Sequence, residues 1–174
     1  MARGFLLGLF TAALLGAAGT YVFVVSGALP ANADSPPPAF ERWAARTSLR
    51  ASISREAPKG DNPVALSDAS LGQGVRLYAQ NCMVCHGASD GKASKIAVGL
   101  YQEAPQLAKD GVEDDPDGKI FWKIKHGIRM TGMPSFSKTL QDDEIWKLTL
   151  FLKHMDALSP GAKKAWQKAG AADK

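Results

Sequence analysis

Two cysteines and a histidine lie within five consecutive residues, Cys82-Met83-Val84-Cys85-His86, and are the side chains of this chain best suited to chemistry. A Cys-x-x-Cys-His run is typical of covalent c-type haem attachment. Two thiols three residues apart on one helical turn can each add to one haem vinyl group, and the next residue then lies beneath the iron. We therefore predict one covalently bound haem c, with thioether bonds from Cys82 and Cys85 and with His86 as an axial ligand of the iron.

Other uses of these two cysteines fit the sequence less well. A thioredoxin-like redox pair has its reactive thiolate at a helix N-terminus, whereas Cys82 and Cys85 follow a segment with helical periodicity. A zinc knuckle needs four ligands, and the other two histidines, His126 and His154, lie far along the chain on different predicted helices. Two cysteines are also too few for a disulfide-rich scaffold.

A second axial ligand has to come from a distant segment that folds over the other face of the haem. The candidate side chains are Met83, Met130, Met133, Met155, His126 and His154. Met83 lies inside the attachment turn and cannot reach the opposite face. The loop over 128–136 is the natural distal lid, and within it Met133 stands between Gly132, which lets the backbone approach closely, and Pro134, which stiffens it.

The elements that must position these residues are helices. Apolar residues at 71, 75, 78 and 82 fall on one face of a helix that begins near Ser67 or Asp68. Gly127 is the predicted stop of a helix that precedes the lid. Further helices are predicted over 40–57, 96–101, 117–126 and 142–155. No segment shows convincing strand alternation, so we predict an all-α fold.

The N-terminal segment is apolar and uncharged from Gly4 to Ala33. Its centre, Phe5 to Val25, would be about 32 Å long as a helix, which is enough to cross a bilayer core and longer than the apolar h-region of a typical secretory signal. This length predicts a retained transmembrane helix. Ala31-Asn32-Ala33 has the small-x-small form of a cleavage site, so cleavage near Ala33 is the alternative, and a buried soluble helix is a third.

We expect four parts along the chain: a membrane anchor or signal peptide (1–29), a Pro-rich linker with a helix (30–63), a haem domain (64–160) and a flexible tail (161–174). The linker contains Pro36-Pro37-Pro38, a spacer. In the helix that follows, Arg42, Arg46 and Arg50 form a basic ridge, either a solvated face or a docking surface for anionic lipid or a partner.

The charge distribution argues against a nucleic-acid-binding protein. The net charge of the chain is +4, but residues 67–158 carry 11 Lys and Arg against 12 Asp and Glu. The predicted haem domain is therefore nearly neutral, whereas a fold built to hold nucleic acid has a basic surface.

Four segments, 74–78, 81–87, 127–136 and 140–152, resemble class I c-type cytochromes, especially bacterial ones with a Gly-Met-Pro-x-Phe ligand loop followed by an acidic helix start and a Trp. The resemblance covers roughly residues 67–158. It implies a cytochrome c fold of three to five helices around the haem, with Met133 as sixth ligand and Met130 as its competitor. It also implies that the carbonyl of Pro105 accepts a hydrogen bond from the proximal imidazole, and that Trp122 and Arg129 could bind haem propionates.

Iron with both axial positions filled by His and Met has no site for a substrate, so we expect an electron carrier and not an enzyme. Its partners would be a periplasmic or membrane dehydrogenase, a quinol-oxidising complex or a terminal oxidase. The alternative is a fixed cytochrome subunit of a larger respiratory or dehydrogenase complex, and a gas sensor or enzyme would require a labile Met133. Because covalent haem attachment occurs outside the cytosol, we expect a single-pass protein on the periplasmic face of a bacterial inner membrane, or a soluble periplasmic one after cleavage.

Overall fold

The computed structural model describes residues 2–28 and 30–171, and every regular element in those ranges is a helix. The helices are α1 (Ala2–Val25), α2 (Ala39–Glu56), α3 (Asp68–Asn81), α4 (Met83–His86), α5 (Lys95–Val98), α6 (Leu107–Asp110), α7 (Asp117–His126), α8 (Asp142–Lys153) and α9 (Pro160–Ala171). The predicted all-α class is confirmed. The extreme ends of the predicted anchor and tail, together with residue 29, lie outside the described residues.

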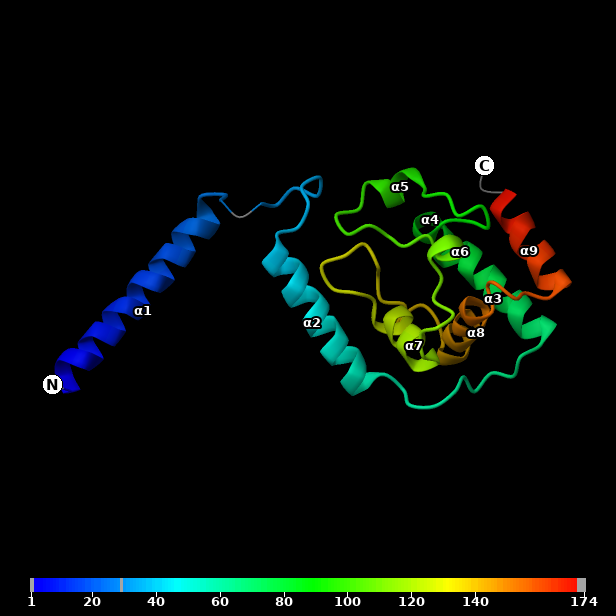
Figure 1. Ribbon diagram of the computed structural model, residues 1–174, viewed down its shortest axis with the longest axis horizontal. Coiled ribbons are helices and arrows are strands. Elements are labelled where there is room, and N and C mark those ends of the chain that lie inside the picture. The colour runs from blue at the N-terminus through cyan, green and yellow to red at the C-terminus, as the bar shows by residue number, and fades with distance from the viewer. Residues whose placement is uncertain (1, 29, 172–174) are drawn as a thin grey trace. The chain divides into compact units, whose positions relative to one another are not determined.

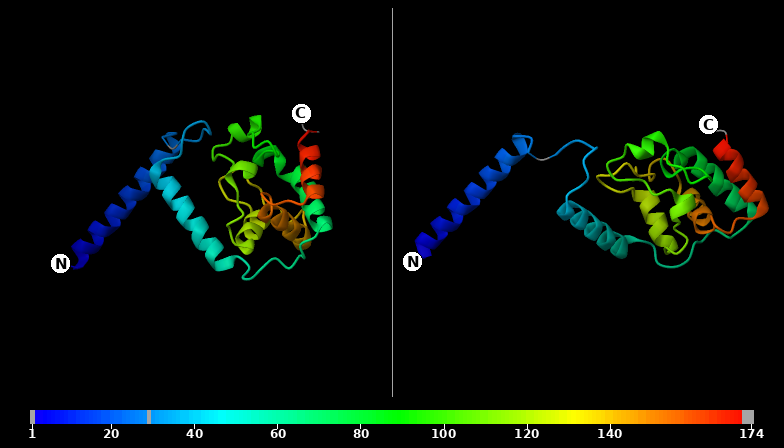
Figure 2. Two further views of the ribbon diagram at one scale, coloured as in Figure 1. Left: turned by 45° about the vertical axis from the view of Figure 1, so that its right-hand side comes forward. Right: turned by 45° about the horizontal axis from the view of Figure 1, so that its top comes forward.

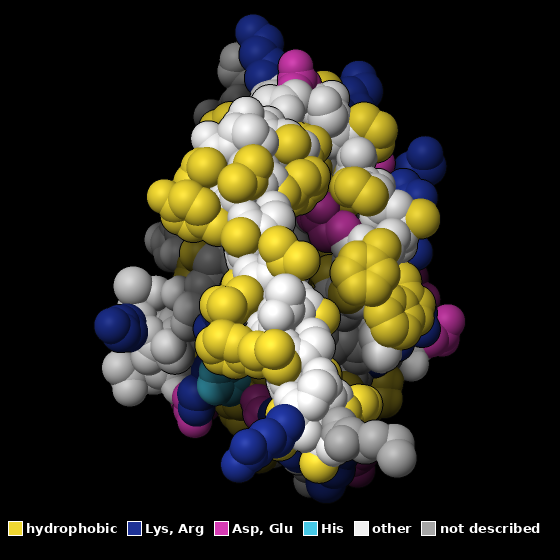
Figure 3. Space-filling model, turned by 90° about the vertical axis from the view of Figure 1, so that its left-hand side faces the viewer, with side chains coloured by type: hydrophobic (Ala, Val, Ile, Leu, Met, Phe, Trp, Pro, Cys, Tyr) yellow, Lys and Arg dark blue, Asp and Glu magenta, His cyan; other side chains and the backbone are white. Residues whose placement is uncertain are grey.

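The chain divides into two units, Met1–Ser35 and Pro36–Lys174, whose helices are labelled in Figure 1. In the first unit, α1 has a mean hydropathy of 1.8 and buries none of its residues. Its 24 residues give a length of about 36 Å. Figure 3 shows apolar side chains exposed along this helix. The helix is long and apolar enough to cross a membrane, a property that an anchor and a signal sequence share.

The core of the second unit is built where α3 crosses α8. Gly74 of α3 lies at the crossing, and a Cβ atom there would be 2.5 Å from the carbonyl oxygen of Lys147 and 2.6 Å from the Cβ of Phe151. Only glycine allows the two helices to approach this closely. One turn later the buried ring of Tyr78 packs edge-on against Phe151, with 5.3 Å between ring centroids.

Helix caps fix where the two crossing helices begin. The Ser67 hydroxyl accepts a hydrogen bond from the Ser70 N–H at 3.1 Å, which confirms the predicted start of α3. Gln141 and Glu144 form a capping box at the start of α8, where three acids lie in the first turn. α7 completes the core by stacking Phe121 on Trp146, with 4.1 Å between centroids.

The C-terminal segment differs from the prediction of a flexible tail. Residues 160–171 form α9, which packs along α3, as both views of Figure 2 show. α9 buries Trp166 against Phe151, with 5.5 Å between centroids, and brings Gly170 so close to Ala88 that a Cβ there would lie 2.8 Å from the Ala88 Cβ. The sequence leaves a frayed helix and a disordered segment both open here, because the buried stripe contains only small residues around a single tryptophan, which is a weak periodic signal.

Candidate functional site

The backbone places both cysteines and His86 on one tight turn. Cys82 ends α3, where its N–H donates to the Tyr78 carbonyl at 2.9 Å, and it also caps α4. The Cys82 carbonyl accepts from the N–H of Cys85 at 3.1 Å and from that of His86 at 2.9 Å. Gly87 then ends α4 with a φ of +76°. Both thiols are free and half-buried on this turn.

The environment of Cys82 is unlike that of a redox-active thiol. Burial, and after it the charge of the neighbouring Cys85, raises the pKa of Cys82 to about 12. A thioredoxin-like pair requires a lowered thiol pKa, because the thiolate is the reactive form. The surroundings of Cys82 therefore do not favour a thioredoxin-like redox pair. Among the described residues, no three His, Cys, Asp or Glu side chains gather as a metal site.

The ring of His86 has a fixed orientation. Its Nδ1 lies 2.9 Å from the carbonyl oxygen of Pro105, as the resemblance implied. Since a carbonyl only accepts, Nδ1 carries the proton. Burial lowers the pKa of His86, while the bond to Pro105 acts in the opposite direction, so the neutral imidazole is favoured at neutral pH. In this tautomer the lone pair is on Nε2, which is the form in which histidine binds a metal.

Two further side chains secure the turn, and neither role was predicted from the sequence. The Gln106 Nε2 donates to the carbonyls of Cys85 (3.1 Å) and Ala104 (2.9 Å), so it joins the segment carrying Pro105 to the attachment turn. The Tyr78 hydroxyl donates to the carbonyl of Gly87 at 2.8 Å and approaches that of His86 at 3.1 Å. No sequence pattern signals either contact, because both join a side chain to backbone that is distant in the chain or beyond a turn.

The second candidate ligand, Met133, lies in a loop with its own hydrogen bonds. Its N–H donates to the Thr131 hydroxyl at 3.1 Å, and its carbonyl accepts from the Ile128 N–H at 3.1 Å. Gly127 starts the loop with a φ of +66°, and a Cβ there would lie 2.5 Å from the carbonyl carbon of Pro134. Met133 is half-buried and packs against the hydrophobic core.

The other ligand candidates have surroundings that differ from those of Met133. Met130 is 84% exposed and has a positive φ of 62°, so its side chain lies in solvent. His126 is exposed, and the Nδ1 of His154 donates to the Leu150 carbonyl at 2.8 Å. The remaining candidates, Met83 and Met155, are buried in the core.

The indole N–H of Trp122 is a buried hydrogen-bond donor that lacks an acceptor of good geometry. The indole is buried, and its Nε1–H has no partner of acceptable distance and angle among the described residues. The carboxylate of Glu56, whose pKa is lowered chiefly by its hydrogen bond with Arg55 and only slightly by Trp122, lies nearby. A buried donor in this state fits an acidic group of a bound cofactor, such as a haem propionate. The other predicted propionate residue, Arg129, is exposed.

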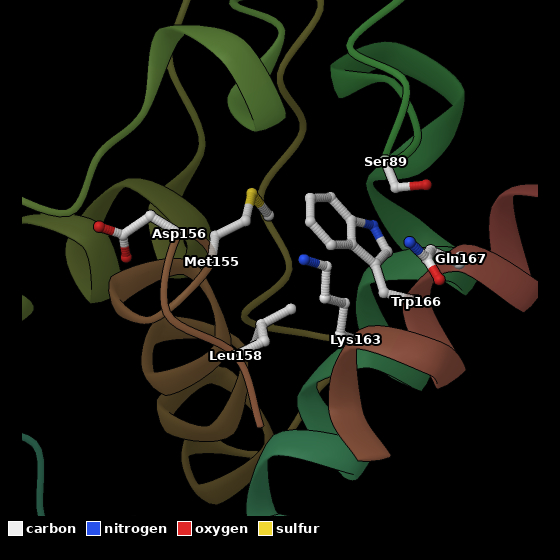
Figure 4. A pocket seen from close by; sticks show the side chains of 7 residues that line it. All are labelled: Ser89, Met155, Asp156, Leu158, Lys163, Trp166 and Gln167. Atoms are coloured by element: carbon white, nitrogen blue, oxygen red, sulfur yellow. The ribbon is translucent and has the colours of Figure 1, made fainter. Parts of the chain in front are cut away.

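A small pocket lies apart from the attachment turn, between the end of α8 and α9 (Figure 4). Its volume is about 120 Å³, which is room for a few water molecules and not for a haem. The residues that line it are Ser89, Met155, Asp156, Leu158, Lys163, Trp166 and Gln167.

The helical fold and the comparison with known families point to the same class of domain, a cytochrome c domain. In particular, residues 69–152, a little under half of the chain, match the family described as cytochrome c oxidase, cbb3-type, subunit III. The match covers α3 to α8 almost entirely, and so it includes the attachment turn and the Met133 loop. A cytochrome c domain implies a haem cofactor and electron transport.

Among curated proteins, the chain is similar to a subunit of nicotinate dehydrogenase from Pseudomonas putida, with 32% identity over 118 residues. The match covers 64% of this chain and only 9% of that protein, so this chain spans a small part of its relative's length. Among solved structures, a chain of the Kuenenia stuttgartiensis reducing HAO-like protein complex has 20% identity and a TM-score of 0.46, over 60% of this chain and 53% of that one. A likeness this weak supports no further inference.

Proposed function

We propose that this protein is a monohaem c-type cytochrome that carries single electrons between periplasmic or membrane redox partners. Cys82 and Cys85 would hold the haem through two thioether bonds, and His86 and Met133 would ligate its iron. When bound, the haem supplies an iron that accepts and donates one electron, and a methionine thioether ligand stabilises its ferrous state. The observation that supports this most strongly is the hydrogen bond from the His86 Nδ1 to the Pro105 carbonyl, on the same turn as two cysteines that are not joined by a disulfide.

The protein's own residues would act by positioning the ligands. The Pro105 carbonyl and Gln106 hold the His86 ring and its turn in place, so the ligand needs no reorientation when the charge on the iron changes. The Thr131 hydroxyl accepts a hydrogen bond from the Met133 N–H, and Gly127 lets the start of the loop lie close to the Pro134 backbone. With two protein ligands, the iron has no position for a substrate, and we propose an electron carrier and not an enzyme.

Matched methionine variants test the ligand set. The full chain is produced together with a c-type cytochrome maturation system, as wild type, Met133→Ala and Met130→Ala. We expect covalent haem in all three by mass spectrometry. Only Met133→Ala should lose the near-infrared band of methionine-ligated ferric haem, and only its ferrous form should bind carbon monoxide.

Three outcomes would contradict the proposal. A colourless wild-type protein with two free thiols would exclude covalent haem. Spectra of Met133→Ala that match wild type would exclude Met133 as the ligand, and loss of the band in Met130→Ala would transfer that role to Met130. A Cys82→Ser, Cys85→Ser double variant that still retained haem after denaturation would exclude the thioethers.

The alternative is a fixed subunit of a larger respiratory or dehydrogenase complex. It is supported by the names of the matching family and of the curated relative, both of which are described as subunits. Extraction from native membranes in mild detergent, followed by size determination and mass spectrometry, distinguishes the two. A free shuttle migrates alone, whereas a subunit migrates with stoichiometric partners.

We further propose that α1 anchors the protein in the inner membrane and that the haem domain lies on the periplasmic face. Its length and apolar composition support this, and removal of α1 near Ala33 is the competing possibility. The intact mass of the protein extracted from membranes measures this directly, because cleavage removes the residues before Asp34.

A further inference from the structure

One face of α2 carries exposed aromatic and basic side chains. Near the helix start, Phe40 is 75% exposed and Trp43 is 61% exposed, and their rings lie 5.6 Å apart. Because an α-helix turns 100° per residue, both rings project to the same side of α2 as Arg50, and Arg46 lies at the edge of that side. Arg42, the third arginine of the ridge, is also exposed, and none of the three arginines forms a salt bridge with a described residue.

α2 is fixed to the cytochrome domain near its start and near its end. Ile53 is buried, α2 packs against α7, and the Glu41 carboxylate accepts a hydrogen bond from the Tyr101 hydroxyl at 2.7 Å. The linker after α2 is secured as well, because the Asn62 side chain donates to the Trp146 carbonyl at 2.8 Å. Because α2 is held to the cytochrome domain at both ends, its exposed aromatic and basic face has a fixed position on that domain.

The chain connection limits how far this face can be from α1. α1 ends at Val25 and α2 begins at Ala39, so 13 residues, 26–38, join them. Even fully extended, this stretch reaches at most about 50 Å, and Phe40 and Trp43 lie at the end of α2 nearest to it. If α1 spans a bilayer, the aromatic end of α2 is always within reach of that bilayer's surface.

We infer that this face of α2, formed by Phe40, Trp43, Arg46 and Arg50, docks on the anionic headgroup surface of the membrane that holds α1. Aromatic side chains prefer the interfacial region, and arginines on the polar face attract anionic lipids. Because the tether makes docking intramolecular, a face too small to bind vesicles on its own is sufficient. The inference rests on the proposed function only in taking α1 as membrane-spanning.

The test uses the full-length, haem-loaded protein in two kinds of nanodisc, one of equal parts phosphatidylglycerol and phosphatidylcholine and one of phosphatidylcholine alone. Amide hydrogen exchange of peptides within 39–50 is followed by mass spectrometry. We expect exchange about fivefold slower in the anionic discs, which is the factor for a face docked about 80% of the time. The slowing should disappear in an Arg46→Glu, Arg50→Glu variant and in a Phe40→Ser, Trp43→Ser variant.

The matched control reverses two exposed lysines on another helix, Lys164→Glu and Lys168→Glu on α9, and should leave the slowing unchanged. Equal exchange in the two discs would overturn the inference. So would slowing that appears only when a redox partner is added, because the face would then be a protein-binding surface. Incorporation of α1 into the discs and the haem spectrum are measured on the same samples, so failure of the proposed anchor or of haem binding is seen separately from failure of α2 to dock.

Discussion

Substitution of Gly74 by alanine tests whether the close crossing of α3 and α8 holds the cytochrome domain together. In a helix interior, Gly→Ala by itself stabilises by about 1 kcal/mol. At this position the new Cβ would lie 2.5 Å from the Lys147 carbonyl oxygen and 2.6 Å from the Phe151 Cβ, and neither atom belongs to a flexible side-chain end. Overpacking of this kind costs about 3 kcal/mol, so we expect a net loss of about 2 kcal/mol in the free energy of unfolding.

The same helix provides a matched control, Gly72→Ala. A Cβ at Gly72 would have only the end of the Arg76 side chain within 4.0 Å, so this variant should be about 0.5–1 kcal/mol more stable than wild type. Guanidinium chloride unfolding of the haem-loaded protein, followed by far-ultraviolet circular dichroism, measures both variants. The reasoning is refuted if Gly74→Ala is as stable as wild type, or if Gly72→Ala is destabilised to the same extent.

Four further changes have defined outcomes. Tyr78→Phe leaves two carbonyls at the end of α4 without their donor and should cost about 1–3 kcal/mol in the same unfolding assay, and an unchanged midpoint would contradict the hydrogen bonds. Gly127→Ala meets both a positive φ and the Pro134 backbone, so it should lower the thermal midpoint and weaken the band of methionine-ligated haem, whereas intact spectra would show that the loop tolerates a side chain. Trp166→Ala should cost about 3–5 kcal/mol, and a neutral effect would show that α9 is not part of the core. Burial raises the pKa of the Asp115 carboxyl, but its partners Lys119 and Lys123 outweigh burial, so the pKa is lowered in the folded protein. The ionised Asp115 therefore adds less than about 1 kcal/mol of stability at a pH above the ordinary Asp pKa, and this stability is lost as the pH falls below that value. Asp115→Asn should accordingly reduce the acid sensitivity of unfolding measured between neutral and acidic pH.

Most of the helical core could be predicted from the sequence because its signals are local. Ser67 and Gly127 mark a helix start and a helix stop by residue type alone, and the structure shows both. The helix expected over 40–57 is α2, within one residue at each end. The structure of the tail could not be predicted, because α9 owes its stability to packing on α3 and on Ala88, and this partnership is not visible in a segment of alanine, lysine and one tryptophan.

The residues of the candidate site can be predicted from the sequence, but the contacts and backbone conformations that position them cannot. The motif defines Cys82 and His86 by spacing, whereas the choice between Met133 and Met130 depends on backbone conformation. The positive φ of Met130 turns it outward, and no rule of residue type predicts that at a methionine. The role of Gln106 depends on bringing together residues 85 and 106, and this is a consequence of the fold and not of any local pattern.

The position of α9 has a consequence for the order in which the protein matures. This helix is the last of the described elements, and its Gly170 packs against Ala88, two residues beyond His86. In a chain exported from its N-terminus, the two thiols emerge well before the segment that later covers the residues behind them. In the haem attachment proposed above, the enzyme would therefore meet both thiols before α9 is in place, and α9 would pack behind them after the thioether bonds have formed.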